Sequence, residues 1–199
     1  SGGVKENPPQ PIFGRREIPY PTMLLSLYRA ASDVNISGLV INLDELRIGF
    51  AQAQEIRNAI QYARSMGKKV IVHAGYPNNI TYYVASAADS IYLPPVSQLN
   101  LVGLRAELTF YAGTLEKLGI KADLLRIGDY KTATEAFTNE QSSDAGKEQI
   151  NRLLDNLFAQ MVSAIAEGRG LSTDSVKALI ENGPFNSQQD FAQLIVGRG

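Results

Sequence analysis

One lysine has neighbours that suggest chemistry. In the stretch RIGDYKTATEAF (126–137), Lys131 lies between an apolar, strand-like run and residues that favour a helix start. A neutral amine can serve as a general base toward a nucleophile held elsewhere in a fold. Taken alone, a lysine after a strand is usually a solvated surface cation, so the residues around it must decide between the two readings.

Two carboxylates near Lys131 bear on its charge. Asp129 lies two residues before the lysine and Glu135 four residues after it. A carboxylate beside an ammonium raises the pKa of that ammonium, and Lys131 and Glu135 share a face if the segment is helical. A Glu135 side chain that points away would instead orient another group. In this half alone we expect Lys131 to be partly exposed and charged, and hence inactive.

Composition excludes several other classes of function. The 199 residues carry a net charge of -1, so no global field attracts nucleic acid, and nucleic-acid binding is not expected. Without cysteine there is no thiolate nucleophile and no disulfide. His73 is the only histidine, which makes a metal site improbable on composition, and its apolar surroundings predict a buried core histidine. We expect no metal and no cofactor.

Hydrophobic patterning predicts alternating helices and strands. Short apolar runs are typical of strands buried on both faces of a parallel sheet, and runs with a spacing of three to four residues are typical of helices. This alternation predicts an α/β fold with a mostly parallel sheet. We expect residues 1–20 to form an extended lead-in and residues 21–199 to form a single domain. Strands are predicted at 38–44, 68–76, 90–95 and 121–129, and helices at 22–33, 50–67, 81–89, 104–119, 144–168 and 173–182.

Polar, glycine-bearing loops follow three of the predicted strands. In open α/β sheets, chemistry gathers beyond the carboxyl ends of the strands. The three loops are DELRIG, GYPNNIT and GDYKTATE. Lys131 belongs to the last of them, which strengthens its candidacy as a site residue.

Three blocks in this order resemble the signal peptide peptidase A family, also called protease IV: GLVINLDELRIGFAQAQEIRNAI, VIVHAGYPNNITYYVASAADSIYLPP and LEKLGIKADLLRIGDYKTATEAFT. The likeness runs from about residue 20 to residue 195. It implies a ClpP/crotonase-like fold of repeated β-β-α units. It also implies a serine endopeptidase that hydrolyses cleaved signal peptides with a Ser-Lys dyad.

The resemblance carries over residue by residue. Tyr130 and Lys131 match the tyrosine and general-base lysine of the family's GxYKS-like block, so Lys131 is the catalytic candidate. The family's nucleophilic serine begins an SGGYY block, and here the matching stretch is NITYY, with Asn79 in the place of the serine. The glycines that would help form an oxyanion site are also absent. We therefore expect this chain to hold no nucleophile and to be inactive alone.

Long-form members of the family have a duplicated domain, with the lysine in the N-terminal half and the serine in the C-terminal half. The resemblance implies that this chain is such an N-terminal half. Its expected partners are a peptide substrate, the serine-bearing half and further copies in a tetramer. The expected location is the bacterial cell envelope, with a membrane anchor outside this fragment and the domain facing the periplasm or exterior.

Two other functions remain open at this stage. One is a non-catalytic assembly or peptide-binding domain of the same fold. The other is a crotonase-type enzyme for acyl thioesters, which needs paired backbone amides that GYPNNIT does not suggest. Among the remaining polar residues, Ser86 is expected to be a small helix residue packed on the sheet. Tyr82 and Tyr83 are expected to pack between layers.

Overall fold

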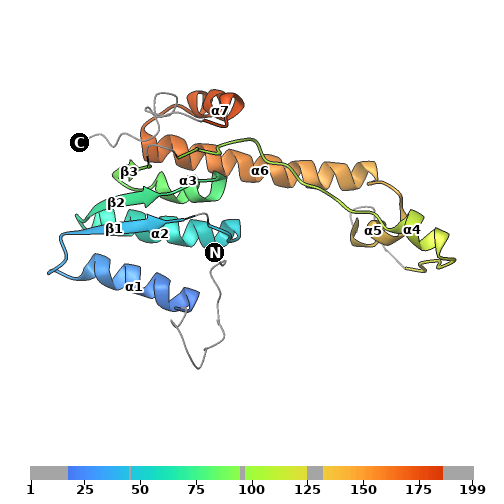
Figure 1. The fold of residues 1–199 in the computed structure, drawn as a ribbon, viewed down its shortest axis with the longest axis horizontal. Coiled ribbons are helices and arrows are strands. Elements are labelled where there is room, and N and C mark those ends of the chain that lie inside the picture. Colours follow the sequence, from blue (N-terminus) through green and yellow to red (C-terminus); the bar gives the residue numbers. More distant parts are fainter. Residues whose placement is uncertain (1–17, 45, 95–96, 125–131, 186–199) are drawn as a thin grey trace. The chain divides into compact units, whose positions relative to one another are not determined.

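The computed structural model describes residues 18–44, 46–94, 97–124 and 132–185 (Figure 1). Helices and strands alternate through the first half of the chain, which confirms the predicted α/β class. The elements are α1 (Tyr20–Ser32), β1 (Gly38–Leu43), α2 (Phe50–Ser65), β2 (Lys69–Ala74), α3 (Asn79–Ala85), β3 (Ser90–Tyr92), α4 (Ala112–Lys117), the 3-10 helix η1 (Thr132–Thr134), α5 (Glu135–Thr138), α6 (Asp144–Arg169) and α7 (Thr173–Asn182).

The three strands form a parallel sheet in the order β1-β2-β3. Val40 of β1 pairs with Ile71 of β2, and His73 of β2 pairs with Tyr92 of β3. The predicted parallel sheet is therefore confirmed for these strands. Of the fourth predicted strand, 121–129, residues 121–124 are not in a strand and the rest lie outside the described residues.

Side chains on one face of the sheet pack against helices and form the hydrophobic core around the sheet. Alternate residues of β2, which are Val70, Val72 and Ala74, are fully buried. Helices α2 and α3 both contact β2, and Figure 1 shows them running along the sheet. The apolar stripe predicted for α2 supplies the opposing side chains, with Ile56 and Ile60 almost completely buried.

On the opposite face of the sheet the described side chains are exposed or half-buried, so the prediction that these strands are buried on both faces is wrong. His73 is exposed rather than buried in the core, and Val40 and Tyr92 on the same face are 71% and 57% exposed. Because side chains alternate along a strand, one covered face accounts for the burial of β2. A continuous apolar run shows that a strand forms but not which faces are covered.

Helix boundaries follow the predicted start and stop signals. Gly67 and Gly119 both have positive φ, at 76° and 70°, just after α2 and α4 end. Ser172 precedes α7 and its hydroxyl accepts a hydrogen bond from Ser175 N–H, as an N-cap does. The predicted helix over 104–119 is shorter than expected, since only Ala112–Lys117 is helical.

By its internal contacts the chain divides into two compact units, residues 1–102 with 161–199, and residues 103–160. The first holds the sheet. In the second, the only buried described residues are Glu135 and Gly146. The prediction of one domain over 21–199 stays a prediction. None of the helices in the described part of the chain has the length and apolar content to cross a membrane.

Candidate functional site

Lys131, the predicted general base, lies outside the described residues, as do Tyr130 and Asp129. The described chain resumes at Thr132, the first residue of η1. The Thr132 hydroxyl donates to Oε1 of Gln149 on α6 at 3.0 Å. The segment that directly follows the predicted base is thus attached to α6.

Glu135 is 2% exposed, a rare environment for a carboxylate. Ser143 donates to it twice, from the backbone N–H at 3.0 Å and from the hydroxyl at 2.6 Å. The Ser143 hydroxyl also accepts from Gly146 N–H at 3.0 Å, which makes Ser143 the N-cap of α6. A negative charge at a helix N-terminus is stabilised by the helix dipole. Glu135 therefore orients a capping side chain. That it points away from Lys131 stays a prediction, because Lys131 lies outside the described residues.

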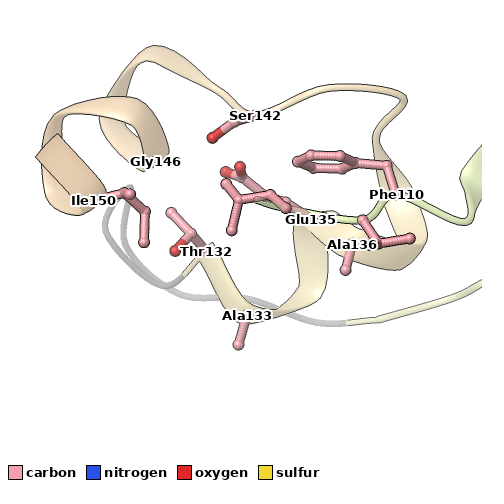
Figure 2. A pocket seen from close by; sticks show the side chains of 10 residues that line it. Phe110, Thr132, Ala133, Glu135, Ala136, Ser142, Gly146 and Ile150 are labelled. Atoms are coloured by element: carbon pink, nitrogen blue, oxygen red, sulfur yellow. The ribbon is translucent and has the colours of Figure 1, made fainter. Parts of the chain in front are cut away.

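A cavity of about 230 Å³ adjoins this carboxylate (Figure 2). Figure 2 shows Glu135 and Ser142 lying beside it together with the ring of Phe110. The lining is mostly apolar, and the carboxylate gives it one polar side. It is formed by Leu108, Thr109, Phe110, Thr132, Ala133, Glu135, Ala136, Ser142, Gly146 and Ile150.

Asn79, at the position of the family's serine, is the first residue of α3. Its side-chain amide pairs with the backbone of Val102 in both directions: Nδ2 donates to the Val102 carbonyl at 2.8 Å, and Oδ1 accepts from Val102 N–H at 2.9 Å. The preceding Asn78 caps the helix by accepting from Thr81 N–H at 2.9 Å. A carboxamide is not a nucleophile, and this one holds a neighbouring stretch of chain.

The two tyrosines of α3 lie in the core, which confirms that they pack between layers. Tyr82 is completely buried and Tyr83 is 3% exposed. Burial raises the pKa of both hydroxyls, while the nearby guanidiniums of Arg169 and Arg57 act in the opposite direction. Both side chains therefore stay neutral in the folded protein at ordinary pH.

Ser86 was predicted to be a helix residue packed on the sheet. It is fully buried but lies just after α3 as its C-cap, and its hydroxyl contacts a buried arginine of α2. Arg57, 2% exposed, donates to the Ser86 hydroxyl at 2.7 Å and to the Tyr83 carbonyl at 2.8 Å. It also donates to the carbonyl of Ala164 on α6. Burial lowers the pKa of Arg57, partly offset by Tyr83 and Glu167. The arginine thereby joins α2, α3 and α6, which is a structural role.

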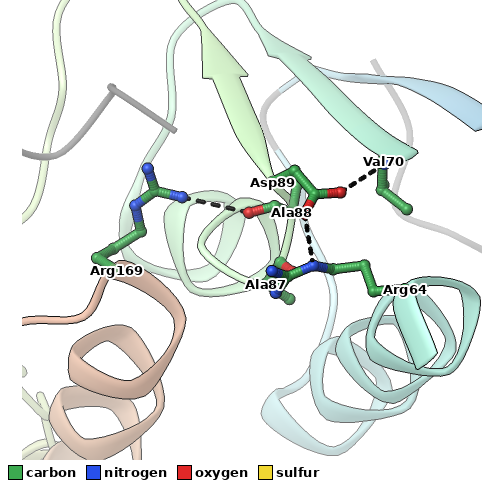
Figure 3. Close-up of polar contacts among 6 residues, drawn as sticks. All are labelled: Arg64, Val70, Ala87, Ala88, Asp89 and Arg169. Atoms are coloured by element: carbon green, nitrogen blue, oxygen red, sulfur yellow. Dashed lines mark hydrogen bonds and ion pairs between the residues drawn. The ribbon is translucent and has the colours of Figure 1, made fainter. Parts of the chain in front are cut away.

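A second polar cluster joins the end of α3 to its surroundings (Figure 3). The Asp89 carboxylate accepts from Val70 N–H at 2.8 Å and forms an ion pair with Arg64 at 3.0 Å. Burial alone would raise the pKa of Asp89, but these two partners outweigh it and the pKa is lowered. Arg169 donates to the Ala88 carbonyl at 3.2 Å.

Two contacts of this region were not predicted from the sequence. Ser143 follows a polar turn and comes directly before a long helix, which is an N-cap signature that the sequence does contain. The pairing of Asn79 with Val102 has no local signal, because the two lie 23 positions apart in the sequence. Within the described residues, no group of three or more His, Cys, Asp or Glu side chains could hold a metal ion.

Comparison with known proteins gives consistent matches along most of the chain. The profile of peptidase family S49 matches residues 62–197. "Serine protease SPPA, chloroplastic" of Arabidopsis thaliana is 27% identical over 169 residues, which cover 85% of this chain and 25% of that protein. "Protease 4" of Haemophilus influenzae is 30% identical over 178 residues, covering 89% and 28%. "Putative signal peptide peptidase SppA" of Enterococcus faecium is 20% identical over 192 residues, covering 95% and 55%.

Proposed function

The chain belongs to peptidase family S49, and from this premise we propose that it is one part of a serine peptidase with a Ser-Lys dyad. Lys131 supplies the general base, and the serine nucleophile comes from a C-terminal half of the same protein. The lengths of the relatives support this division, since the chain spans only about a quarter of the two that name a serine protease or Protease 4.

The observation that carries the proposal is the state of Asn79. At the position where the resemblance expects a nucleophile, the side chain is an amide whose nitrogen and oxygen both bond to Val102. This residue can neither attack a carbonyl carbon nor leave its place without releasing that backbone. A peptidase built on this chain therefore needs a hydroxyl from elsewhere.

The chemistry permits a division between domains, because base and nucleophile meet only through their side chains. The neutral lysine amine removes the proton of the serine hydroxyl as its oxygen attacks the scissile carbonyl carbon, and water then hydrolyses the acyl-enzyme. The amine is neutral at pH 7 only if its pKa falls from about 10.4 toward about 7 to 8. Burial by the serine-bearing half would lower the pKa in this way.

The proposal extends to substrate, location and fold. The substrates are peptides, with cleaved signal peptides as the natural class. The protein works at the bacterial cell envelope, with a membrane anchor outside residues 1–199 and this domain facing the periplasm or exterior. The fold is of the ClpP/crotonase type with repeated β-β-α units, and the parallel three-stranded sheet lined by α2 and α3 supports it.

Homo-oligomerisation, with a tetramer as the expected form, is also part of the proposal. Unit 103–160 leaves many large apolar side chains exposed and buries none of them fully. Such surfaces are typical of contacts with other chains or domains. The exposed residues are Leu108, Tyr111, Leu118, Ile120, Leu124, Phe137 and Leu153.

The test is Lys131→Ala in the complete protein, with hydrolysis of a small peptide ester as the assay. Loss of a general base should lower kcat by about 10³-fold. Lys121→Ala, which changes an exposed lysine of the same unit, is the matched control and should leave the rate unchanged. Full activity of Lys131→Ala would remove the catalytic assignment.

A second candidate function is a non-catalytic assembly or peptide-binding domain. The tethered Asn79 and the exposed apolar side chains of 103–160 favour it as well. The two functions differ in one measurable respect. In the second, Lys131→Ala leaves peptide-ester hydrolysis intact, whereas replacement of the exposed apolar residues weakens assembly.

A further inference from the structure

We propose that Glu135 is a positioning residue for this reaction. Its carboxylate, held by Ser143 at the N-terminus of α6, fixes the segment that begins one residue after Lys131. The inference rests on the proposed function, since it assigns Glu135 a role only if Lys131 is the base.

The first step is the cost of burying the carboxylate. A carboxyl group that is only 2% exposed must be compensated by hydrogen bonds, or its burial would destabilise the fold. Ser143 supplies two of them, at 3.0 Å and 2.6 Å, and both come from the residue that caps α6. The contact therefore connects α5 to a 26-residue helix rather than to another loop.

The second step concerns Gly146, whose missing side chain leaves room for the Glu135 carboxylate. A Cβ atom added there would lie 2.9 Å from Glu135 Oε2 and 2.5 Å from the Ser142 hydroxyl. Both distances are below any ordinary carbon–oxygen contact. The first turn of α6 thus has a glycine at the position where the carboxylate approaches it.

The third step is that the same segment is held at a second point. The hydroxyl of Thr132, the residue that follows Lys131, donates to the side chain of Gln149 in the second turn of α6. Directly after Glu135, the carbonyl of Ala136 accepts from Tyr111 N–H at 2.6 Å. Hydrogen bonds at Thr132, Glu135 and Ala136 therefore hold this segment to α6 and to Tyr111.

Lys131 is joined to Thr132 by a peptide bond, and Cα atoms joined in this way are only about 3.8 Å apart. The proposed role requires that a displacement of Thr132 also displaces the base. A general base must come within about 3 Å of the hydroxyl it deprotonates, and an error of about 1 Å can cost about 10²-fold in rate. Release of Glu135 should therefore slow the chemical step more than it weakens substrate binding.

The experiment uses the complete protein, the same peptide ester and three variants. Glu135→Gln keeps the shape but weakens acceptance from Ser143, and should lower kcat by about 10- to 100-fold with KM within about 2-fold. Ser143→Ala removes one donor and should lower kcat by about 5-fold. Ser143→Thr keeps the hydroxyl and should restore most of the rate.

Glu140→Gln is the matched control, because Glu140 is an exposed glutamate close by in sequence, and its kcat should not change. Thermal unfolding of every variant separates lost stability from lost rate. A purely structural cap would lower the melting temperature and leave the kcat of the folded fraction unchanged, which would overturn the inference. Equal kcat for Ser143→Ala and Ser143→Thr would overturn it as well.

Failure of this inference and failure of the proposed function are distinguishable. If Lys131→Ala abolishes hydrolysis while Glu135→Gln and Ser143→Ala retain the normal kcat, the dyad stands and the positioning role is wrong. If Lys131→Ala remains fully active, the dyad itself is wrong. If Glu135→Gln does not fold, the comparison of kcat between Ser143→Ala and Ser143→Thr tests the positioning role by itself.

Discussion

At the scale of single residues, Asn79 shows how a side chain can complete the hydrogen bonding of a distant backbone. Its amide does for Val102 what a neighbouring strand would do, since it both donates and accepts. A serine hydroxyl is too short to make both bonds. The two hydrogen bonds to the Val102 backbone therefore account for an asparagine at position 79.

Asn79→Ala should destabilise the protein by about 1 to 3 kcal/mol, because the Val102 N–H and carbonyl lose their partner at a partly buried site. Chemical denaturation of the complete protein measures this change. Asn100→Ala, at an exposed asparagine of the same stretch, should change the free energy of unfolding far less. Equal effects of the two substitutions would contradict the assigned role.

Arg57 is the second residue whose removal has a clear expected result. Arg57→Met keeps much of the side-chain volume but leaves the Tyr83 and Ala164 carbonyls without its hydrogen bonds. We expect a loss of about 3 kcal/mol in the free energy of unfolding. Arg152→Met is the comparison, because the Arg152 side chain is 77% exposed and its substitution should be nearly neutral.

At the scale of elements, Asp89 joins the turn after α3 to β2 and α2 through Val70 and Arg64. Its pKa in the folded protein lies below the ordinary value of 3.8. A carboxyl group with a lowered pKa contributes stability above its unfolded-state pKa, and this contribution is lost as the pH falls through the folded-state value.

The stability difference between the wild type and Asp89→Asn should therefore be constant near neutral pH and should shrink once the pH falls below about 4. Urea unfolding at a series of pH values checks this. A difference that does not depend on pH would show that the ionised carboxylate is not what stabilises the turn.

The helices and strands could largely be predicted from the sequence, and the contacts between them could not. Apolar runs locate β1, β2 and β3, and glycine marks the ends of α2 and α4, because these signals are local. The exposure of His73 was missed, since an apolar run shows that a strand forms but not which face of the sheet the helices cover.

The candidate site was only partly predictable. Asn79 was identified as a departure from a nucleophile. Its bonds to Val102 join residues 23 positions apart, with the rest of α3 and all of β3 between them, and no local pattern specifies such a contact. Glu135 was identified as a residue that could orient another group, and its partner Ser143 lies across a turn. Lys131 stays a prediction, because it lies outside the described residues.

At the scale of the whole molecule, the proposed self-association would use the exposed apolar side chains of unit 103–160. Leu118 is 67% exposed and Ile120 is 53% exposed, close together after α4. Burial of such side chains contributes about 1.5 to 3 kcal/mol each, and every 1.4 kcal/mol changes an association constant about tenfold.

Leu118→Lys and Ile120→Lys should each weaken self-association of the complete protein by about tenfold or more, because a charge replaces an apolar contact. Sedimentation velocity over a range of concentrations measures the shift toward smaller species. Val34→Lys alters a residue that is 90% exposed in the other unit and should leave the distribution unchanged. Unaltered assembly of the two α4-region variants would refute the proposed contact surface.

Gly146 has a consequence for directed evolution of this protein. In a library randomised at codon 146, residues other than glycine should be depleted among folded clones, since even the methyl group of alanine would lie 2.9 Å from Glu135 Oε2 unless that side chain moved. Gly113 offers the contrasting case, because a methyl group there would meet its nearest neighbour, Glu140 Oε1, only at 3.5 Å. Deep sequencing of survivors should therefore recover alanine freely at codon 113 and rarely at codon 146.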